Sequence, residues 1–132
     1  MKIRKKQIEL KRANGKFPRL LLVLDDCSGV IKESKIFANF LIAHRHFEIS
    51  IFFVVQYATD LSPRYRELAN YAIVFNQTTE KSLKAVYETY FRDFDNLRQF
   101  IRWFQNSLKE KYTFFFVDRG ERTKNVMKCP NM

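Results

Sequence analysis

The sequence predicts an α/β fold in which helices flank a mostly parallel sheet. Strand-like and helix-like segments alternate along the 132 residues, an order typical of layered α/β domains. The first strand-like run, residues 20–24, is continuously apolar, as expected for a parallel strand that is buried on both faces. The length suits one domain with its own core, and a hydrophobic content of 46% argues against disorder.

A basic segment precedes the predicted sheet. Residues 1–16 are charged and polar, and we expect them to form a helix or an exposed arm that ends at the turn dipeptide Asn14-Gly15. Two roles stay open for this segment, contact with DNA or simple solubilisation. The predicted organisation is therefore a basic segment at 1–17, a folded domain at 18–120 and a tail at 121–132.

The first half of the domain is predicted to contain two strands, at 20–24 and 49–55. A loop at 27–29 and a helix over about 32–46 join them, because apolar residues recur at helical spacing from Ile36 to Leu41. The second strand is rich in Ile, Val and Phe, which favour strands.

The second half alternates in the same way. The expected elements are a short helix starting at Ser62-Pro63, a strand at 71–75, a helix opened by Thr78 or Thr79, a helix at 93–108 and a strand at 112–117. Proline suits the first helical position, and threonine can cap exposed amides. Residues 121–132 are polar and are expected to be loose.

Charge and cysteine content limit the function classes. The net charge is +10, from 24 Lys and Arg against 14 Asp and Glu, and such a surface favours a polyanion, most often nucleic acid. Cys27 and Cys129 form no C-x-x-C pair, so a zinc site is not expected and reduced, intracellular thiols are. No apolar run has the length of a membrane span or follows the basic start as a signal peptide would.

Polar side chains gather where the predicted strands end. Asp25-Asp26 follow the first strand, Gln56 closes the second, and Arg64 and Arg66 lie on the helix after it. Open α/β sheets bind ligands at that edge. A triphosphate hydrolase needs side chains of these types at that edge. One carboxylate holds magnesium, another polarises the attacking water, an amide lies near the γ-phosphate, and an arginine neutralises the charge that develops on the transferred phosphoryl group. The plainer alternatives are acids that cap a strand or helix and arginines that are only surface charges.

One part of such a site is missing from the sequence. No Gly-x-x-x-x-Gly-Lys-Ser/Thr loop occurs, and the chain has only three glycines. Phosphate-binding loops normally use several glycines. We therefore do not expect this chain alone to cradle a triphosphate.

Four segments in order resemble the genome-packaging ATPases of large double-stranded DNA viruses, which belong to the FtsK–HerA superfamily; the poxvirus-type members are most similar. The segments are residues 20–27, 43–51, 54–57 and 61–70. The resemblance is strongest over about residues 18–77. It implies a three-layer, P-loop NTPase-like (RecA/ASCE-type) domain that is incomplete here, because the family's Walker A loop and strand have no counterpart.

The resemblance also implies roles for individual residues. Asp25 resembles the Walker B acid that holds Mg²⁺ through water, Asp26 the catalytic acid, and Gln56 the sensor on the next strand. Arg66 is the better candidate for an arginine finger that reaches a neighbouring subunit, and Arg45 is the alternative. The implied cofactors are Mg²⁺ and ATP, in a chain completed by its missing half.

Two functions from different classes follow. The first is an ATPase motor that forms a homo-oligomeric ring and drives double-stranded DNA into a capsid, with capsid or packaging components as partners, in a viral factory of the host cytoplasm or in the virion. This chain would be a fragment, a split gene product or a degenerate copy. The alternative is a non-enzymatic basic α/β protein that binds DNA or a packaging-motor subunit. A magnesium nuclease built on Asp25 and Asp26 is a weaker idea, because no third acid is placed to complete a metal cluster.

Overall fold

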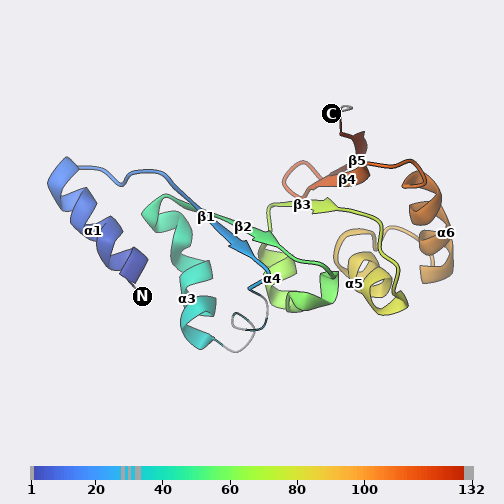
Figure 1. Cartoon of the computed structure of the whole chain (residues 1–132), viewed down its shortest axis with the longest axis horizontal. Helices are drawn as coiled ribbons and strands as arrows, with labels where there is room; N and C mark the ends of the chain where they lie inside the picture. Colours follow the sequence, from blue (N-terminus) through green and yellow to red (C-terminus); the bar gives the residue numbers. More distant parts are fainter. Residues whose placement is uncertain (1, 28, 30, 32–33, 130–132) are drawn as a thin grey trace. The chain divides into compact units, whose positions relative to one another are not determined.

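The computed structural model describes residues 2–27, 29, 31 and 34–129, and its elements alternate as expected for an α/β protein (Figure 1). It contains two compact units, Met1–Gln56 and Tyr57–Met132. We refer to them as unit 1 and unit 2.

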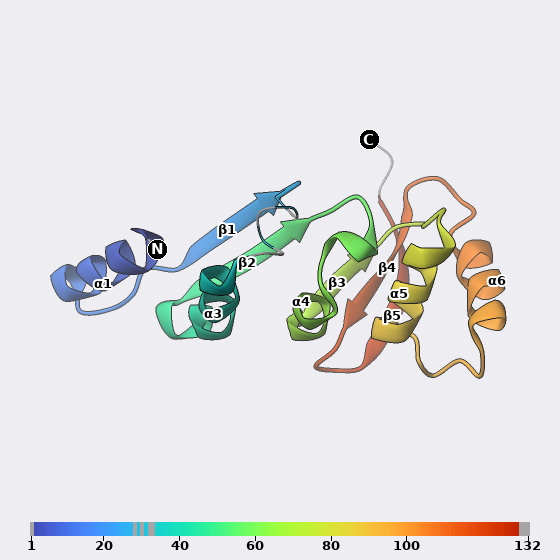
Figure 2. The ribbon, with the colours of Figure 1, turned by 90° about the horizontal axis from the view of Figure 1, so that it is seen from below.

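Unit 1 contains a pair of parallel strands. Its elements are α1 (Lys2–Asn14), β1 (Leu20–Asp25), α3 (Lys35–Ala43), the 3-10 helix η1 (His44–Phe47) and β2 (Ile49–Val54). The ladder runs from Leu20 opposite Ile49 to Asp25 opposite Val54, and the two strands run side by side in Figure 2. The predicted parallel pairing is confirmed for these strands.

Capping residues set the ends of the helical segment between the strands. The Ser34 side chain accepts a hydrogen bond from the Phe37 amide, so α3 begins at Lys35. The backbone continues as η1 and ends at Glu48, which has a left-handed φ of 53°. The predicted helix over 32–46 is confirmed from residue 35 onward; its positions 32 and 33, and position 28 of the predicted loop, lie outside the described residues.

Helix α1 is docked and is not an extended arm. The Gln7 side chain is buried, and its Nε2 donates to the carbonyl oxygens of Pro18 at 2.9 Å and Phe47 at 3.1 Å. Gly15 ends the helix with a φ of 75°, a conformation in which glycine avoids the Cβ clash. Of the two predicted alternatives for this segment, the helix is confirmed.

The β1–β2 pair is covered on one face and open on the other. A small core of Phe40, Phe47 and Ile49, with Leu22 and Ile51 against it, fills the covered face. On the open face the exposed fractions are 61% for Leu21, 53% for Val23, 47% for Phe52 and 41% for Val54. The prediction that residues 20–24 form a strand buried on both faces is therefore wrong for this chain, because no described element of unit 1 covers the second face.

Unit 2 contains an antiparallel sheet with order β3-β4-β5. Its elements are the 3-10 helix η2 (Ala58–Asp60), α4 (Pro63–Leu68), β3 (Tyr71–Val74), α5 (Glu80–Tyr90), α6 (Leu97–Ser107), β4 (Thr113–Asp118) and β5 (Thr123–Lys128).

Local sequence signals position the helices of unit 2. Thr79 caps α5 by accepting a hydrogen bond from the Ser82 amide, and Pro63 opens α4, both as predicted. The helix predicted from residue 93 instead begins at Leu97, because the Asn96 side chain caps it by accepting from the Gln99 amide.

Helices α5 and α6 cover one face of the sheet with an aromatic core (Figure 1). Phe91, Phe100, Phe104 and Phe115 are fully buried there, with Phe115 supplied by β4. The neighbouring residues Phe114 and Phe116 point to the other face of the sheet and are half-buried, as alternation along a strand requires.

The prediction of a loose tail is wrong for residues 123–128. These residues form β5, which pairs antiparallel with β4 from Thr123 opposite Asp118 to Lys128 opposite Thr113. Edge strands can carry polar and charged side chains, so β5 lacks the apolar pattern by which strands are recognised. The Asp118 side chain accepts from the Gly120 amide and holds the connecting turn.

Candidate active site

The two predicted acids, Asp25 and Asp26, lie at the carboxyl end of β1. Asp25 is the last strand residue, opposite Val54. Asp26 turns away from the strand with a φ of 49°, and its amide donates to the Val54 carbonyl at 3.1 Å. The Cys27 thiol donates to the Asp25 carbonyl at 3.0 Å. This turn holds both carboxylates at the strand end, where both residues are exposed.

Gln56 lies just after the neighbouring strand, β2, at the same end of the sheet. It follows Val54 by two residues and is exposed. Because β1 and β2 are parallel and hydrogen-bonded, their carboxyl ends lie side by side. The structure thus brings Asp25, Asp26 and Gln56 to one edge of one sheet, whereas their catalytic roles stay a prediction.

The chemistry of this edge suits a magnesium ion that is bound mainly by water and phosphate. Carboxylate oxygens are the ligands that Mg²⁺ prefers, and it usually takes one or two of them together with waters and substrate phosphates. Across the described ranges, no group of three or more His, Cys, Asp or Glu residues could hold a metal by itself. A metal at Asp25 therefore fits only together with a phosphate ligand.

Arg45 lies at the other end of the same strand. It is an exposed residue of η1, which precedes β2, whereas Gln56 follows β2. A strand rises about 3.3 Å per residue, so the six residues of β2 separate these ends by roughly 16 Å or more. Arg45 therefore does not lie beside the acid pair of its own chain.

Arg66 is turned into unit 2. Only 8% of it is exposed. Its Nη1 donates to the carbonyl oxygens of Ala58 at 2.9 Å and Leu61 at 2.5 Å, and its Nε donates to the Thr89 hydroxyl at 3.1 Å. These bonds tie η2 and the start of α4 to α5, a structural task that the sequence did not reveal.

Tyr90 lies beside this arginine. Its hydroxyl donates to the Arg66 carbonyl at 3.5 Å, and burial raises the pKa of Tyr90, opposed by the positive charges of Arg119 and Arg66. The Arg119 guanidinium donates to the carbonyls of Arg66 and Glu67, at the end of α4. This cluster fixes the short helix in the fold.

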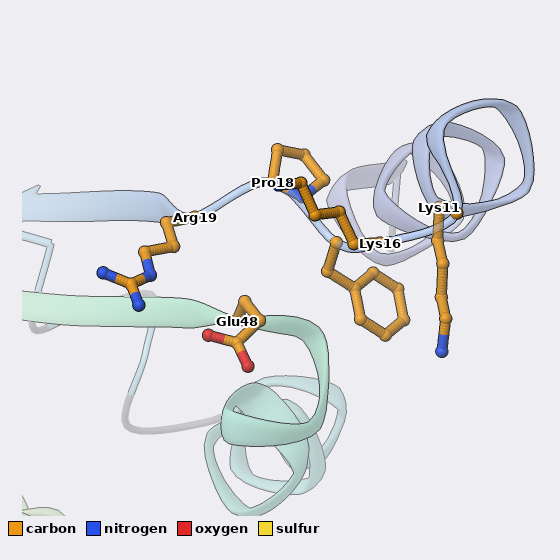
Figure 3. Close-up of a pocket in the computed structure, with 7 residues that line it drawn as sticks. Lys11, Lys16, Pro18, Arg19 and Glu48 are labelled. Carbon is orange, nitrogen blue, oxygen red and sulfur yellow. The ribbon is translucent and has the colours of Figure 1, made fainter.

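A basic hollow lies at the amino ends of the unit 1 strands. Figure 3 shows Lys11 on α1, Lys16 after it, Arg19 just before β1 and Glu48 just before β2. None of these side chains was predicted individually as a site residue, and their positive charge is the signal by which the sequence could have indicated them. The hollow and the acid pair lie at opposite ends of β1.

No helix within the described ranges is both long and apolar enough to cross a membrane.

Comparison with known proteins places the fold. No protein-family model matches the chain. It is 26% identical over 108 residues to the uncharacterized protein 075L of Invertebrate iridescent virus 6. The match covers 78% of this chain and 40% of 075L.

The structural neighbours are more informative. The crystal structure of B204, the DNA-packaging ATPase from Sulfolobus Turreted Icosahedral Virus, matches with a TM-score of 0.71 at 18% identity, over 98% of this chain and 61% of B204. The genome packaging NTPase B204 of Sulfolobus turreted icosahedral virus 2 matches with a TM-score of 0.68 in two complexes. The complex with AMP is 18% identical and matches over 85% of this chain and 54% of that one. The complex with ATP-gammaS is 17% identical and matches over 96% of this chain and 60% of that one.

These matches establish a mixed α/β fold similar to that of a P-loop NTPase-like packaging ATPase, with a parallel strand pair and flanking helices. The fold is incomplete here, because this chain spans only 54–61% of those structures and 40% of the curated relative.

Proposed function

We propose that this chain is the Walker B-bearing part of a viral genome-packaging ATPase of the FtsK–HerA type, and that it acts once a phosphate-binding segment completes it. The observation that carries the proposal is the meeting of Asp25-Asp26 and Gln56 at one edge of a parallel sheet. The similarity to packaging NTPases supports it at the level of the fold.

The proposed roles follow from chemistry at this edge. Bound Mg²⁺ would neutralise charge on the ATP phosphates. Asp25 holds that ion through water, Asp26 polarises the attacking water, and Gln56 orients it or senses the γ-phosphate. Arg45 is exposed, as a finger that reaches a neighbouring subunit must be. Arg66 is buried and donates to Ala58, Leu61 and Thr89, so it would have to become exposed to act in this way.

Unit 1 has room for the completing segment. The apolar side chains of Leu21, Val23, Phe52 and Val54 are exposed on one face of β1–β2. Parallel sheets are normally covered on both faces. Among the described residues β2 pairs only with β1, so its other edge can accept a further strand. A segment that supplies the phosphate loop on such a strand would satisfy both features.

The proposal extends to the whole motor. The completed protein forms a homo-oligomeric ring, moves double-stranded DNA into a capsid and works with capsid or packaging components, in a viral factory of the host cytoplasm or in the virion. The uneven charge of +10 supports a DNA partner.

Co-expression tests the enzyme. The chain is produced with a polypeptide from the same genome that carries a Gly-rich phosphate loop, first sought in the coding sequence just before Met1. We expect a complex that hydrolyses ATP only with Mg²⁺. Asp26→Asn should lower kcat by about 100-fold or more, the range for loss of a general base, and Asp25→Asn should raise the magnesium concentration needed for half-maximal rate.

Asp95→Asn is the matched control, because it removes one exposed carboxylate of unit 2 and should leave both parameters unchanged. A complex that turns over ATP equally well with Asp26→Asn would overturn the assigned site. Salt-sensitive DNA binding without turnover in any complex would instead favour the second candidate, a non-enzymatic basic α/β protein that binds DNA or a packaging-motor subunit.

A further inference from the structure

The positive charge of the chain is concentrated at its start. Eight of the 24 Lys and Arg residues lie within residues 1–19, against the single acid Glu9. Most of the net charge of +10 therefore comes from α1 and the segment that leads to β1. A concentrated charge of this kind creates a strong local field, which the same residues spread over the surface would not.

This basic region is held in a fixed position. Gln7 anchors α1 to the carbonyls of Pro18 and Phe47 through two hydrogen bonds. The Arg4 guanidinium lies over the Phe47 ring at 5.0 Å, and the Lys11 ammonium lies over the Phe17 ring at 4.5 Å. The region is thus preorganised, and binding to it does not require a loose arm to become ordered.

Three cations project from the side of α1 that lies opposite Gln7. Lys2, Lys5 and Arg12 are exposed, and their spacing of three and seven residues places them on one helix face. They extend over about 15 Å at 1.5 Å per residue. Lys6 is paired with Glu9 at 3.6 Å in solvent, an interaction that binds neither side chain strongly.

Two more cations follow the helix in the sequence. Lys16 and Arg19 are exposed on the segment between α1 and β1 and line the hollow in Figure 3, where Glu48 is the one acid among the lining residues. We call Lys2, Lys5, Arg12, Lys16 and Arg19 the basic face.

The character of the basic face selects among polyanions. Ile3 and Ile8 of α1 pack against the core of unit 1, and Leu10 is partly buried, so the helix has no fully exposed apolar face to insert into a lipid surface. Phe17 and Phe47 are each covered by a cation, so these rings are not presented for stacking on unpaired bases. What remains is a set of cations suited to backbone phosphates.

We propose that the basic face binds the phosphate backbone of duplex DNA without reading its sequence. The choice of DNA among polyanions rests on the proposed function, but the surface does not involve Asp25, Asp26 or Gln56. Cation contacts to phosphates release counterions, so affinity falls with salt with a slope of about 0.9 per contact on a logarithmic scale.

The test uses the full chain and a short, fluorescently labelled duplex of random sequence, with anisotropy measured over a series of NaCl concentrations. Lys5→Gln/Arg12→Gln should weaken binding and lower the salt slope by about two, one unit per lost phosphate contact. The matched control, Lys81→Gln/Lys109→Gln, removes two exposed cations of unit 2 and should leave the slope unchanged. Far-UV circular dichroism should show both variants folded, because all four side chains are exposed.

Equal loss of affinity in the two double variants would overturn the proposal, since it would mean attraction by net charge alone. Tighter binding to single strands or to vesicles containing phosphatidylserine than to the duplex would also overturn it. The ATPase test is independent of this one. Loss of turnover in Asp26→Asn with unchanged DNA affinity would support separate nucleotide and DNA surfaces. Failure of the chain to bind DNA would overturn this inference and would not bear on the nucleotide site.

Discussion

The two units differ in the size of the core that covers one face of the sheet. In unit 2, α5 and α6 bury one face of β3-β4-β5 with four fully buried phenylalanines. In unit 1, the core on the covered face of the two parallel strands is much smaller. The second face of each sheet exposes apolar side chains, Leu21 and Val23 in unit 1 and Tyr71 and Ile73 in unit 2. A two-stranded sheet is marginal in water without more cover. The difference between the units is therefore the size of the core, and the larger core of unit 2 stabilises its sheet more.

The largest expected effect contrasts the two cores. Phe104→Ala, at a fully buried position of unit 2, should lower the free energy of unfolding by about 3–5 kcal/mol. Phe52→Ala, at a position of unit 1 that is 47% exposed, should cost less than about 1 kcal/mol. Urea denaturation measures both, with Trp103 fluorescence for unit 2 and far-UV circular dichroism for the whole chain. A loss at Phe52 as large as that at Phe104 would mean that the open face is covered in solution.

The next effect tests what Arg66 does inside unit 2. Arg66→Met keeps much of the side-chain length but removes the donors to Ala58, Leu61 and Thr89. We expect a loss of about 2 kcal/mol in stability, because buried acceptors lose their partners. Arg64→Met, at an exposed position on the same helix, should change stability by less than about 0.5 kcal/mol.

Normal stability of Arg66→Met combined with lost activity in the completed complex would restore Arg66 as the arginine finger. The comparison with Arg64 separates a structural contact from a charge that acts only on a neighbouring subunit.

A smaller effect concerns alkaline pH. Burial raises the pKa of Tyr90 above the ordinary value for tyrosine, so the unfolded chain ionises first and stability is lost as pH rises above about 10. Tyr90→Phe should remove that part of the loss while costing little near neutral pH, because its hydrogen bond is long at 3.5 Å.

Thermal unfolding at a series of pH values between about 8 and 11, the range in which tyrosine ionises, measures the difference. Tyr112→Phe, at an exposed position of the same unit, is the control and should keep the alkaline loss. An identical pH profile for Tyr90→Phe and the unmodified chain would contradict the expected burial of the phenol.

The smallest expected effect is at Ser82, a residue of α5. The Ser82 hydroxyl is buried and has no hydrogen-bond partner among the described residues. Ser82→Ala should therefore be neutral or stabilise unit 2 by up to about 1 kcal/mol, since alanine removes an unsatisfied polar group and is a better helix former. Thr79→Ala, which removes the α5 cap, should instead cost about 1 kcal/mol. Chemical denaturation of the pair measures both signs.

Local signals in the sequence predicted most elements well. The strands β1 to β4 lie within a residue of their predicted bounds. A cap at Thr78 or Thr79 and a helix start at Ser62-Pro63 were predicted from residue type alone, and the structure has the cap at Thr79 and the start at Pro63. The meeting of Asp25 and Gln56 at one edge was also predictable, because two parallel neighbouring strands end together.

What the sequence did not reveal depends on contacts between distant residues. An apolar run such as residues 20–24 indicates that a strand can be buried on both faces, but not whether a partner layer is present. The inward turn of Arg66 depends on where the carbonyls of Ala58 and Leu61 lie. The strand β5 has polar side chains, and its pairing with β4 comes from the turn and the free edge.

The thiol of Cys27 offers a practical reporter. It is partly exposed and lies directly after the acid pair, where its Sγ donates to the Asp25 carbonyl. The other thiol, Cys129, is exposed in unit 2 and can be replaced by serine. An environment-sensitive dye attached to Cys27 would then report on the proposed site: a change in its emission on adding magnesium and nucleotide would show binding without measuring turnover.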